Sequence, residues 1–536
     1  MECSCLSYRE LPHTTKLFAS YIYEFPQVSQ WYAHAPDEAG VLESAAEIRM
    51  DPVVRRQVVE ILEEQNRAFG IDGKVEQNLA RLADGAVAIV TGQQVGLFGG
   101  PAYSIYKAAG VLRWAEHLTE RGRDAVPVFW LATEDHDLAE VNQTFFKGSA
   151  GLSEFAVQIP PEFEGRSVGE IALPKEITEV VEKAAIRLDG SYSEETSRAL
   201  KESYRPGESF GSAFGKLMAR LFAGRGLILI EPLDSRIHRL ASSVYRRALE
   251  NNDSIQADLL KRAKELESAG YHAQVRTGRE GSLMFVKVEG KREPVRSRGG
   301  NFTAGRRTFS KNEFQEMAQE SPELVSANVL LRPVVQDTLL PTAAYIAGPA
   351  EIAYYAQAER VYRALLGRMP AILPRSSITL VEPALGRILK KYRMDAHDVL
   401  QGRQNLRAKL ALHALPAGLM KRFERDEKAL GRLLQGYRKP LEQLDKTLVG
   451  AIDTAERKML YQFTKLRAKA GRAENGRAGV LDRHESLLLE ALCPRRALQE
   501  RTLNFLPFLS QYGSNLLDQI SEHSGPTCPD HKICFL

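Results

Sequence analysis

The stretch 85–107, GAVAIVTGQQVGLFGGPAYSIYK, constrains the fold more than any other part of this 536-residue chain. Ala86–Val90 is an apolar run of strand length, with valine and isoleucine where a buried parallel strand has them. Thr91–Gly100 then interrupts every regular pattern with four glycines and two glutamines. Pro101 is favoured as the first residue of a helix, and apolar residues follow at helical spacing. A strand, a glycine-rich turn and a helix in this order predict an α/β fold.

The same turn is a candidate anion-binding loop, because a helix N-terminus presents free backbone N–H groups and a positive dipole end. Its sequence matches neither GxGxxG nor GxxxxGK[ST], the standard nucleotide-binding motifs. The alternative is a tight turn that needs its glycines for steric reasons alone. On the first interpretation the candidate ligand-binding residues are Gly92, Gln93, Gln94, Gly99, Gly100 and Tyr103.

A second predicted strand, Ala125–Ala132, runs directly into the acidic sequence TEDHDLAEVN. Ligands of open α/β sheets bind at the carboxyl ends of the strands. An imidazole there can deprotonate an amine, and neighbouring carboxylates can orient it or bind Mg²⁺. Zinc is disfavoured, since no second histidine or cysteine lies at ligand spacing, and an ordinary acidic helix start is the alternative. The candidates are Glu134, Asp135, His136 and Asp137 for catalysis and Asn142 for substrate binding.

Ala343–Gln357 repeats the order of strand, Gly-Pro turn and helix, which adds Tyr345 and Glu351 as candidate substrate ligands. Arg332 can bind a substrate carboxylate, or it can form a structural pair with Asp337. Near the C-terminus, polar residues lie among apolar ones and can hold a nucleotide or clamp this segment onto the core. These candidates are Gln499, Arg501, Asn504 and Tyr512.

The pattern of apolar residues changes after residue 386. Apolar residues in Phe423–Leu466 are spaced mostly by threes and fours, which predicts a coiled coil with an apolar seam. Pro440 predicts a kink or a break, and Gly471–Gly479 predicts a turn after which 480–492 folds back antiparallel. A seam of this length predicts a homodimer. The excess of Lys and Arg on this arm is interpreted as a solvated face, and nucleic-acid binding is the less favoured alternative.

The chain is therefore expected to contain three parts. They are an α/β parallel-sheet core over 1–386 with insertions at about 145–205 and 270–310, a helical antiparallel coiled coil over 387–492, and a C-terminal segment over 493–536 that returns to the core. In the second insertion, an alternating pattern around Gly278–Ser282 predicts a β-hairpin. Residues 1–80 are expected to be helical.

Composition indicates a soluble cytoplasmic protein. No apolar run reaches the roughly 18–20 residues that a membrane helix needs, and the first residues lack the features of a signal peptide. The net charge of +4 is small for this length. The five cysteines lie near the two chain ends, and their odd number without framework spacing predicts reduced thiols. A metal site of Cys528, His531 and Cys534 on a loose tail is the less favoured alternative.

Four sequence segments, spread over nearly the whole chain, resemble those of a known family. They are TGQQVGLFGGPAYSIYKA (91–108), PVFWLATEDHDLAEVN (127–142), YIAGPAEIAYYAQ (345–357) and QERTLNFLPFLSQYG (499–513). Together with the long seam, they resemble the BshC family, the cysteine ligases of bacillithiol biosynthesis. The resemblance implies a Rossmann-like core laid out like that of class I aminoacyl-tRNA synthetases, two connecting insertions and a dimerising coiled coil.

The resemblance also implies a reaction, in which cysteine is joined to glucosaminyl-malate to give bacillithiol. Amide formation from a free carboxylate in water is uphill, so ATP or another nucleotide is expected to activate the cysteine. Asp135 and His136 are expected to orient and deprotonate the attacking amine, and Asp137 to bind sugar hydroxyls or a metal. The turn is expected to bind a malate carboxylate or a phosphate. The alternatives are a nucleotide-binding coiled-coil interaction protein without catalysis, and a tRNA-binding protein.

Overall fold

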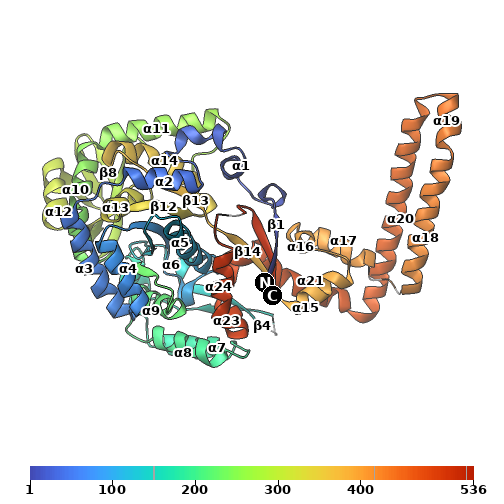
Figure 1. Cartoon of the computed structure of the whole chain (residues 1–536), viewed down its shortest axis with the longest axis horizontal. Coiled ribbons are helices and arrows are strands. Elements are labelled where there is room, and N and C mark those ends of the chain that lie inside the picture. Colours follow the sequence, from blue (N-terminus) through green and yellow to red (C-terminus); the bar gives the residue numbers. More distant parts are fainter. Residues whose placement is uncertain (149–150, 414, 416, 527) are drawn as a thin grey trace.

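The centre of the molecule is a five-stranded parallel sheet (Figure 1). The computed structural model describes residues 1–536 except 149–150, 414, 416 and 527. The strand order is β13-β12-β2-β3-β6, and every neighbouring pair is parallel. The strands are β2 (Val87–Gln93), β3 (Ala125–Leu131), β6 (Ile228–Ile230), β12 (Thr342–Ala347) and β13 (Ala371–Pro374). The predicted α/β class is confirmed.

Helices cover both faces of this sheet, because successive residues of a strand point to opposite sides. In β2, Ala88 and Val90 join one hydrophobic core, whereas Val87 and Ile89 join the other. Helix α5 packs on β2 and β3, and α3 packs on β6. The helices around the sheet are α1 (Lys16–Tyr23), α2 (Glu38–Glu47), α3 (Pro52–Phe69), α4 (Gly73–Ala83), α5 (Tyr103–Glu120), α9 (Phe210–Leu221), α13 (Arg332–Leu339) and α14 (Pro349–Leu365).

Two long segments separate strands of the sheet. Between β3 and β6 lie α6 (Leu138–Val141), the hairpin of β4 (Gln143–Gly148) and β5 (Gly151–Ala156), α7 (Ile177–Ala185) and α8 (Ser193–Ser203). Between β6 and β12 lie α10 (Ser235–Glu250), α11 (Asn252–Ser268), β7 (Gly281–Val288), β8 (Lys291–Arg298), β9 (Asn301–Ala304), β10 (Arg307–Ser310), α12 (Lys311–Glu320) and β11 (Val325–Ala327). Strands β7 to β11 form a five-stranded antiparallel sheet of order β10-β9-β8-β7-β11.

The hairpin predicted around Gly278–Ser282 has its turn elsewhere. Strands β7 and β8 pair, but they are joined at Glu289 and Gly290, where the backbone adopts positive φ. Residues 278–281 form a short turn that leads into β7. The prediction was right about the strands and wrong about the turn.

A long helical arm projects away from the sheet domain (Figure 1). The arm and its base consist of α15 (Pro383–Lys391), α16 (Ala396–Leu400), α17 (Arg403–His413), α18 (Ala417–Gly436), α19 (Arg438–Leu444), α20 (Leu448–Ala478) and α21 (Val480–Leu492). Helices α18 and α19 run antiparallel to α20, and the rings of Phe423 and Phe463 meet between them with centroids 5.3 Å apart. The expected break near Pro440 is present, because α18 ends at Gly436 and α19 begins two residues later.

The turn predicted over Gly471–Gly479 is wrong for most of its length, because α20 continues to Ala478 and the arm reverses at 445–447. The break is confined to Gly479, which has a φ of 62°, and the helix predicted after it begins at Val480. The glycine at position 471 serves helix packing. A Cβ added to Gly471 would lie 1.8 Å from the carbonyl oxygen of Ala411 in α17. This glycine therefore permits the close approach of two helices instead of ending one.

The two ends of the chain meet in a small sheet of order β1-β15-β14. Strand β1 (Glu2–Leu6) is antiparallel to β15 (His531–Phe535), which is parallel to β14 (Ser377–Val381). Disulfides join Cys3 to Cys534 and Cys5 to Cys528, and Cys493 is free. The predictions of reduced thiols and of a loose tail are therefore wrong, and the alternative metal cluster is not formed. Residues 1–80 are largely helical as expected, except that residues 2–6 form β1. The other C-terminal helices are α22 (Gln499–Thr502), α23 (Leu506–Tyr512) and α24 (Asn515–Glu522).

Throughout the described parts of the chain, every helix is too short or too polar to cross a bilayer.

The second half of the glycine-rich turn is buried and serves close packing. A Cβ on Gly96 would lie 2.8 Å from the Cα of Gly100. Gly99 and Gly100 have φ of 90° and 68°, a region that favours glycine. Their N–H groups donate to the carbonyls of Gly96 and Leu97. The predicted use of these N–H groups for an anion is therefore wrong, and the steric alternative holds for this half of the turn.

The C-terminal segment covers the start of helix α5. This helix begins at Tyr103 and not at the predicted Pro101, which forms an isolated bridge with Asn504. The N–H of Ala102 donates to the carbonyl of Leu503 at 2.8 Å. The backbone N–H of Ala102 at the helix start is therefore bound by the protein itself.

Asn504 clamps this region, and we expect its loss to destabilise the fold. It is 1% exposed, and its side-chain amide donates to the carbonyls of Phe98 and Gly100 at 2.8 and 2.9 Å. Asn504→Ala leaves these buried acceptors unpaired, so the free energy of unfolding should fall by about 2–4 kcal/mol in urea titrations. Asn515→Ala, at the exposed start of α24, is the control and should cost less than about 0.5 kcal/mol. Equal effects of the two variants would contradict the clamp.

Candidate functional site

A cavity of about 650 Å³ lies at the carboxyl ends of β2, β3, β12 and β13. This is the edge at which ligands of open α/β sheets bind. The residues predicted from the sequence that line it are Gly92, Gln93, Gln94, Tyr103, Glu134, Asp135, His136, Arg332, Tyr345, Glu351 and Arg501. Segments far apart in the chain therefore converge on one site.

Seven predicted site residues lie outside the lining: Gly99, Gly100, Asp137, Asn142, Gln499, Asn504 and Tyr512. Asp137 is the N-cap residue of the short helix α6. The amide of Asn142 donates to the carbonyl of Val157 at 3.4 Å. Gln499 is buried and pairs with both backbone groups of Leu380. The side chains of Asn142, Gln499 and Asn504 thus bind the protein's own backbone, and Tyr512 lies outside the cavity. The nucleotide contacts predicted for Gln499, Asn504 and Tyr512 are therefore not supported.

A buried ion pair forms one wall of the cavity. Lys107 is 2% exposed, and its Nζ lies 2.5 Å from Glu351 Oε2 and donates to the carbonyl of Gly92 at 2.7 Å. Glu351 also accepts from the N–H of Gly348 at 2.6 Å and from the hydroxyl of Tyr345 at 2.8 Å. Burial alone would raise the pKa of Glu351, but the Lys107 charge and these hydrogen bonds hold it below its usual value. The carboxylate is therefore ionised and fully engaged.

Arg375 is a second buried cation of the cavity. It follows strand β13, and its guanidinium donates to Glu500 Oε1 at 2.6 Å. Its Cζ lies 5.2 Å from the ring centroid of Tyr103. Burial would raise the pKa of Glu500, but Arg375 and the N–H of Ile378 hold it below its usual value. The C-terminal segment thus supplies the counter-charge for a cavity arginine.

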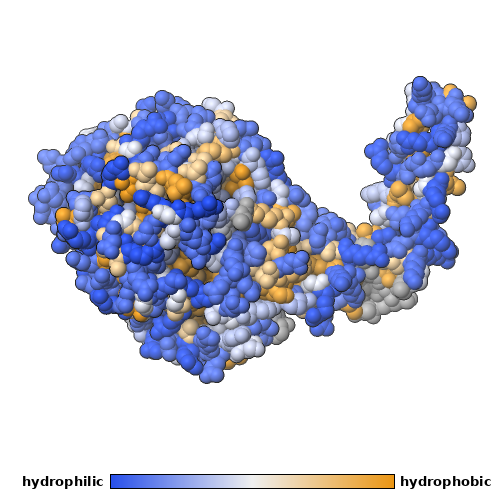
Figure 2. Space-filling model, viewed as in Figure 1, coloured by the Kyte–Doolittle hydropathy of each residue, from blue (hydrophilic) through white to orange (hydrophobic). Residues whose placement is uncertain are grey.

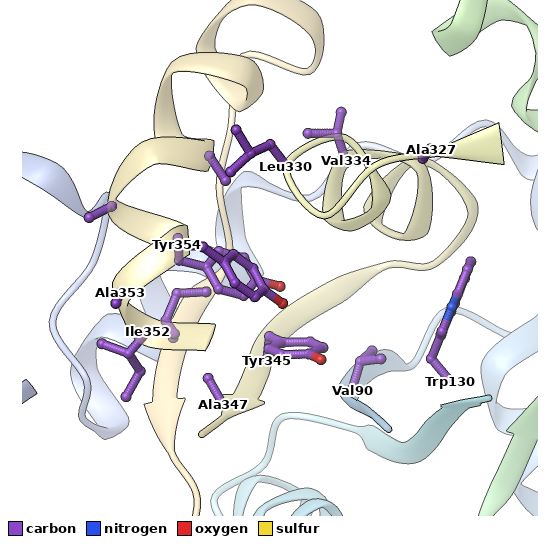
Figure 3. Packing of buried hydrophobic residues seen from close by; sticks show 14 of the residues in the cluster. Val90, Trp130, Ala327, Leu330, Val334, Tyr345, Ala347, Ile352, Ala353 and Tyr354 are labelled. Carbon is purple, nitrogen blue, oxygen red and sulfur yellow. The ribbon is translucent and has the colours of Figure 1, made fainter. Parts of the chain in front are cut away.

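Arg332 and Arg501 have no carboxylate partner among the described residues, and neither has Arg292, whose guanidinium is instead bonded to Ser326, Ala327 and His136. Arg332 donates to the hydroxyl of Tyr354 at 3.2 Å and lies over the ring of Tyr345. The rings of these tyrosines lie close together between β12 and α14 (Figure 3). The alternative structural pair of Arg332 with Asp337 is not formed. Because the charges of Arg332 and the exposed Arg501 are not neutralised, these two residues can bind an anion.

Gln94 connects two carboxylates on the acidic wall. Its Nε2 lies 2.6 Å from Asp135 Oδ2 and 2.6 Å from Glu140 Oε2. Asp135 Oδ1 also accepts from the backbone N–H of His136 at 2.7 Å. The backbone N–H of Asp137 also donates to Oδ1 at 3.4 Å. Three fixed donors thus orient the Asp135 carboxylate, which keeps a lone pair on Oδ2 to accept a proton.

His136 lies where the acidic wall meets the antiparallel sheet. Its Nδ1 is 3.3 Å from Nη1 of Arg292, whose guanidinium stacks on Phe285 with Cζ 3.9 Å from the ring centroid. A guanidinium can only donate, so Nδ1 accepts and the ring proton lies on Nε2. In this arrangement His136 offers a donor to a ligand. The prediction that His136 is the base would require the contact with Arg292 to break.

Glu134 is the deepest carboxylate of this wall. It is 8% exposed, and its Oε1 lies 3.6 Å from His238 Nε2. Behind it, Thr133 donates to Glu231, and burial raises the pKa of Glu231 to about 7. Burial thus disfavours the charged form of Glu231, the carboxyl group behind this wall.

Several residues that line the cavity were not predicted from the sequence. They are Lys107, Trp130, Glu140, Arg292, Tyr354 and Arg375. Arg375 directly follows the short apolar run that forms β13, so it could have been found from the rule that ligands bind at the carboxyl ends of parallel strands. Arg292 comes from strand β8 of the other sheet, and no local pattern marks it.

The described carboxylates of the cavity do not form a ready set of three metal ligands. The one such group among the described residues is Asp395, His397 and Asp398 at helix α16. Asp398 there already pairs with Lys409.

Comparison with known proteins identifies the family. The model of the BshC N-terminal Rossmann-like domain of bacillithiol biosynthesis matches residues 1–376, and that of the C-terminal coiled-coil domain matches 378–536. Relatives from Koribacter versatilis (39% identical over 530 residues) and Solibacter usitatus (35% over 545) are each named "Putative cysteine ligase BshC". Both alignments cover 99% of either chain. The chain therefore belongs to the BshC family of bacillithiol biosynthesis, with a Rossmann-like core and a coiled-coil domain.

Proposed function

We propose that this enzyme joins cysteine to glucosaminyl-malate by forming an amide between the cysteine carboxylate and the sugar amine. The names of the relatives support a cysteine ligase. The observation that carries the proposal is one cavity with uncompensated arginines and, on another wall, Asp135 beside His136. An anionic group and an amine can be held in this space together.

The anionic group binds at Arg332 and Arg501. Their charges are free, whereas Lys107 and Arg375 are already neutralised by Glu351 and Glu500. A malate carboxylate or a phosphate satisfies the geometry of a guanidinium, which donates two parallel hydrogen bonds. This assignment replaces the backbone N–H groups of the glycine-rich turn.

The attacking amine lies against Asp135 and His136. Asp135 accepts the proton that the amine loses as the amide forms, because its carboxylate is fixed by Gln94 and still has a free lone pair on Oδ2. His136 donates through Nε2–H and orients the substrate. Asp137 lies outside the cavity and has no role in this scheme.

The activating group is a nucleoside triphosphate, most simply ATP, which would supply the energy for joining a free carboxylate to an amine. Its phosphates fit the free charges of Arg332 and Arg501. A Mg²⁺ ion prefers oxygen ligands and would be held by the Glu140 carboxylate together with the phosphates, because Asp135 is needed as the proton acceptor.

The reaction is tested with the purified chain, cysteine, glucosaminyl-malate and ATP. We expect mass spectrometry to detect a product equal to the two substrates minus water, and no product without the nucleotide. Deleting the gene in a cell that makes glucosaminyl-malate should cause that compound to accumulate. If the chain binds nucleotide yet neither assay shows ligation, it is an interaction protein without catalysis.

Variants at the acidic wall test which residue takes the proton. Asp135→Asn removes the acceptor, so kcat should fall by about 10²–10⁴-fold. His136→Gln keeps an N–H donor and should lower kcat by less than about tenfold. Asp137→Asn is the matched control outside the cavity and should leave kcat unchanged. A larger loss with His136→Gln than with Asp135→Asn would make the histidine the base.

We also propose that the arm forms a homodimer. Hydrophobic side chains remain on its surface (Figure 2), although the hairpin covers part of the seam. The large apolar residues still exposed there are Leu419, Leu433, Tyr437, Leu444, Met459, Tyr461 and Leu466. The exposure of large apolar side chains along a projecting arm supports their burial by a second copy.

Charged substitutions on the arm should dissociate this dimer. Leu444 is 78% exposed and Leu466 is 55% exposed, so a Leu444→Asp, Leu466→Asp variant should be monomeric at micromolar concentration by light scattering. Ile186→Asp is the control, because Ile186 is also 78% exposed but follows helix α7, away from the arm. A monomeric parent protein, or a variant that stays dimeric, would contradict the proposal.

A further inference from the structure

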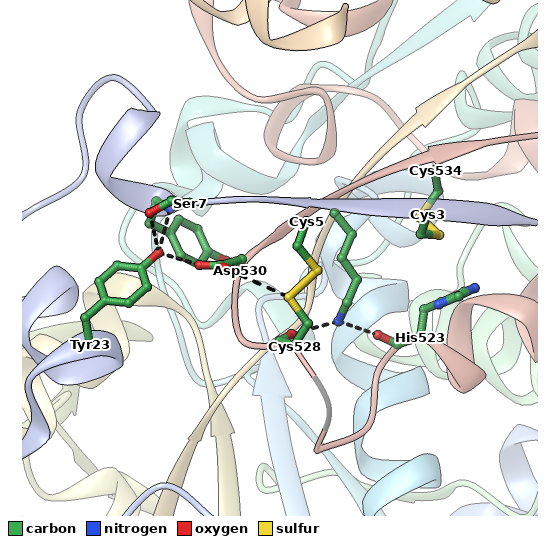
Figure 4. The surroundings of a disulfide bond; sticks show 10 residues. Cys3, Cys5, Ser7, Tyr23, His523, Cys528, Asp530 and Cys534 are labelled. Carbon is green, nitrogen blue, oxygen red and sulfur yellow. Dashed lines mark hydrogen bonds between the residues drawn. A yellow bond between two sulfur atoms is a disulfide. The ribbon is translucent and has the colours of Figure 1, made fainter.

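Four of the five cysteines lie together where the chain ends meet (Figure 4). Cys3 lies directly opposite Cys534 in the β1–β15 pairing and is bonded to it. Cys5 is bonded to Cys528, which precedes β15. Cys534 is fully buried, whereas Cys5 is exposed. A reagent in solution therefore reaches the Cys5–Cys528 bond first.

A buried lysine lies beside this outer bond. Lys532 is 3% exposed and lies opposite Cys5 in the strand pairing. Its Nζ donates to the carbonyls of Cys528 at 2.9 Å and His523 at 2.7 Å (Figure 4). Burial lowers the pKa of Lys532 to about 8. A lysine cation next to a cysteine stabilises the thiolate, the form that reacts in thiol–disulfide exchange.

The opposite face of β15 contacts a buried polar chain that ends in the cavity. His531 Nδ1 donates to Ser377 Oγ at 2.7 Å, and Ser377 donates to Glu500 Oε1 at 2.8 Å. Glu500 holds Arg375 at 2.6 Å. Since successive strand residues alternate between faces, His531 and Lys532 point to opposite sides of β15. The strand that carries the cysteines on one face thus supports a cavity arginine through the other.

We propose that Cys5–Cys528 is an exchange site for low-molecular-weight thiols, and that its oxidation state sets how firmly the β15–Glu500 network holds Arg375. In the oxidised state the bond ties the segment before β15 to β1. In the reduced state that tie is lost and the network loosens. The coupling between the disulfide and the Glu500 network does not depend on the ligase reaction. Any effect of the disulfide on catalysis rests on the proposed function.

The exchange is a balanced two-step reaction. An external thiolate attacks one sulfur of Cys5–Cys528, so a mixed disulfide forms as the protein bond breaks, and the released thiolate takes up a proton. A second external thiolate then attacks the mixed disulfide and displaces the other cysteine. Two external thiols become one external disulfide, and the protein disulfide becomes two thiols. Excess external disulfide drives the reverse reaction.

Alkylation of the full chain tests the exchange. The protein is equilibrated in reduced or oxidised glutathione, treated with N-ethylmaleimide and analysed by mass spectrometry of peptides. We expect Cys5 and Cys528 to be alkylated in reduced glutathione and linked to each other in oxidised glutathione. Cys493, the free cysteine, should behave alike in both and serves as the internal control. Unlinked Cys5 and Cys528 peptides in oxidised glutathione would overturn the proposal.

Hydrogen exchange tests the coupling. The N–H of Ile378 donates to Glu500 Oε2 at 2.8 Å, so a peptide over 375–381 reports on the network. We expect it to exchange at least about threefold faster in reduced glutathione and in a Cys5→Ser, Cys528→Ser variant. A peptide over 52–69 and the Cys493→Ser variant are the controls and should not change. Unchanged exchange over 375–381 in both the reduced protein and the variant would overturn the coupling.

The ligase assay then separates this inference from the proposed function. In the Cys5→Ser, Cys528→Ser variant we expect the KM for glucosaminyl-malate to rise about threefold to tenfold with kcat unchanged, since a displaced Arg375 alters the cavity wall that it forms with Tyr103. An unchanged KM would overturn the catalytic effect. Absence of turnover in the parent protein would count against the ligase assignment alone, because alkylation and hydrogen exchange do not depend on it.

Discussion

The buried ion pair of Lys107 and Glu351 joins the two strand–turn–helix units on which the cavity is built. Lys107 belongs to the helix after β2, and Glu351 lies in the first turn of the helix after β12. Because Lys107 also binds the carbonyl of Gly92, the pair fixes the end of β2 against the start of α14. Removing one partner of such a pair typically costs about 3–5 kcal/mol, since the other charge is left buried. The contact that shapes the cavity wall therefore also holds two layers of the core together.

Charge compensation separates structural from available cations in the cavity. Arg375 is neutralised by Glu500, which comes from the C-terminal segment and is fully buried. Arg332 donates to a tyrosine hydroxyl, and Arg501 is exposed. Neither forms an ion pair among the described residues. An incoming anion gains most at the charges that the protein leaves unpaired. This distinction, more than the number of basic residues, indicates where an anionic substrate binds.

Ligands of open α/β sheets bind at the carboxyl ends of the strands, and this rule located much of the candidate site from the sequence. Residues 92–94, 134–136 and Glu351 follow predicted strands, and the structure brings them to one cavity. The rule does not depend on side-chain detail, because parallel strands end at one edge wherever they lie in the sheet. It failed for the glycines at 96–100, because a glycine pattern does not reveal whether backbone N–H groups are free or already bonded. The carbonyls at Gly96 and Leu97 take those N–H groups, so the anion site moved to arginine side chains.

Local sequence patterns were enough to predict the local elements: apolar periodicity and turn chemistry defined the parallel strands, the helices after them and the break near Pro440. These features depend on residues within a few positions of each other. Tertiary structure alone decided the pairing of Cys3 with Cys534, which are 531 residues apart, and the contribution of Arg292 from a separate sheet. It also decided that Gly471 serves helix packing instead of a turn. Contacts of this kind follow from how distant surfaces pack, and no local pattern records which surfaces will meet.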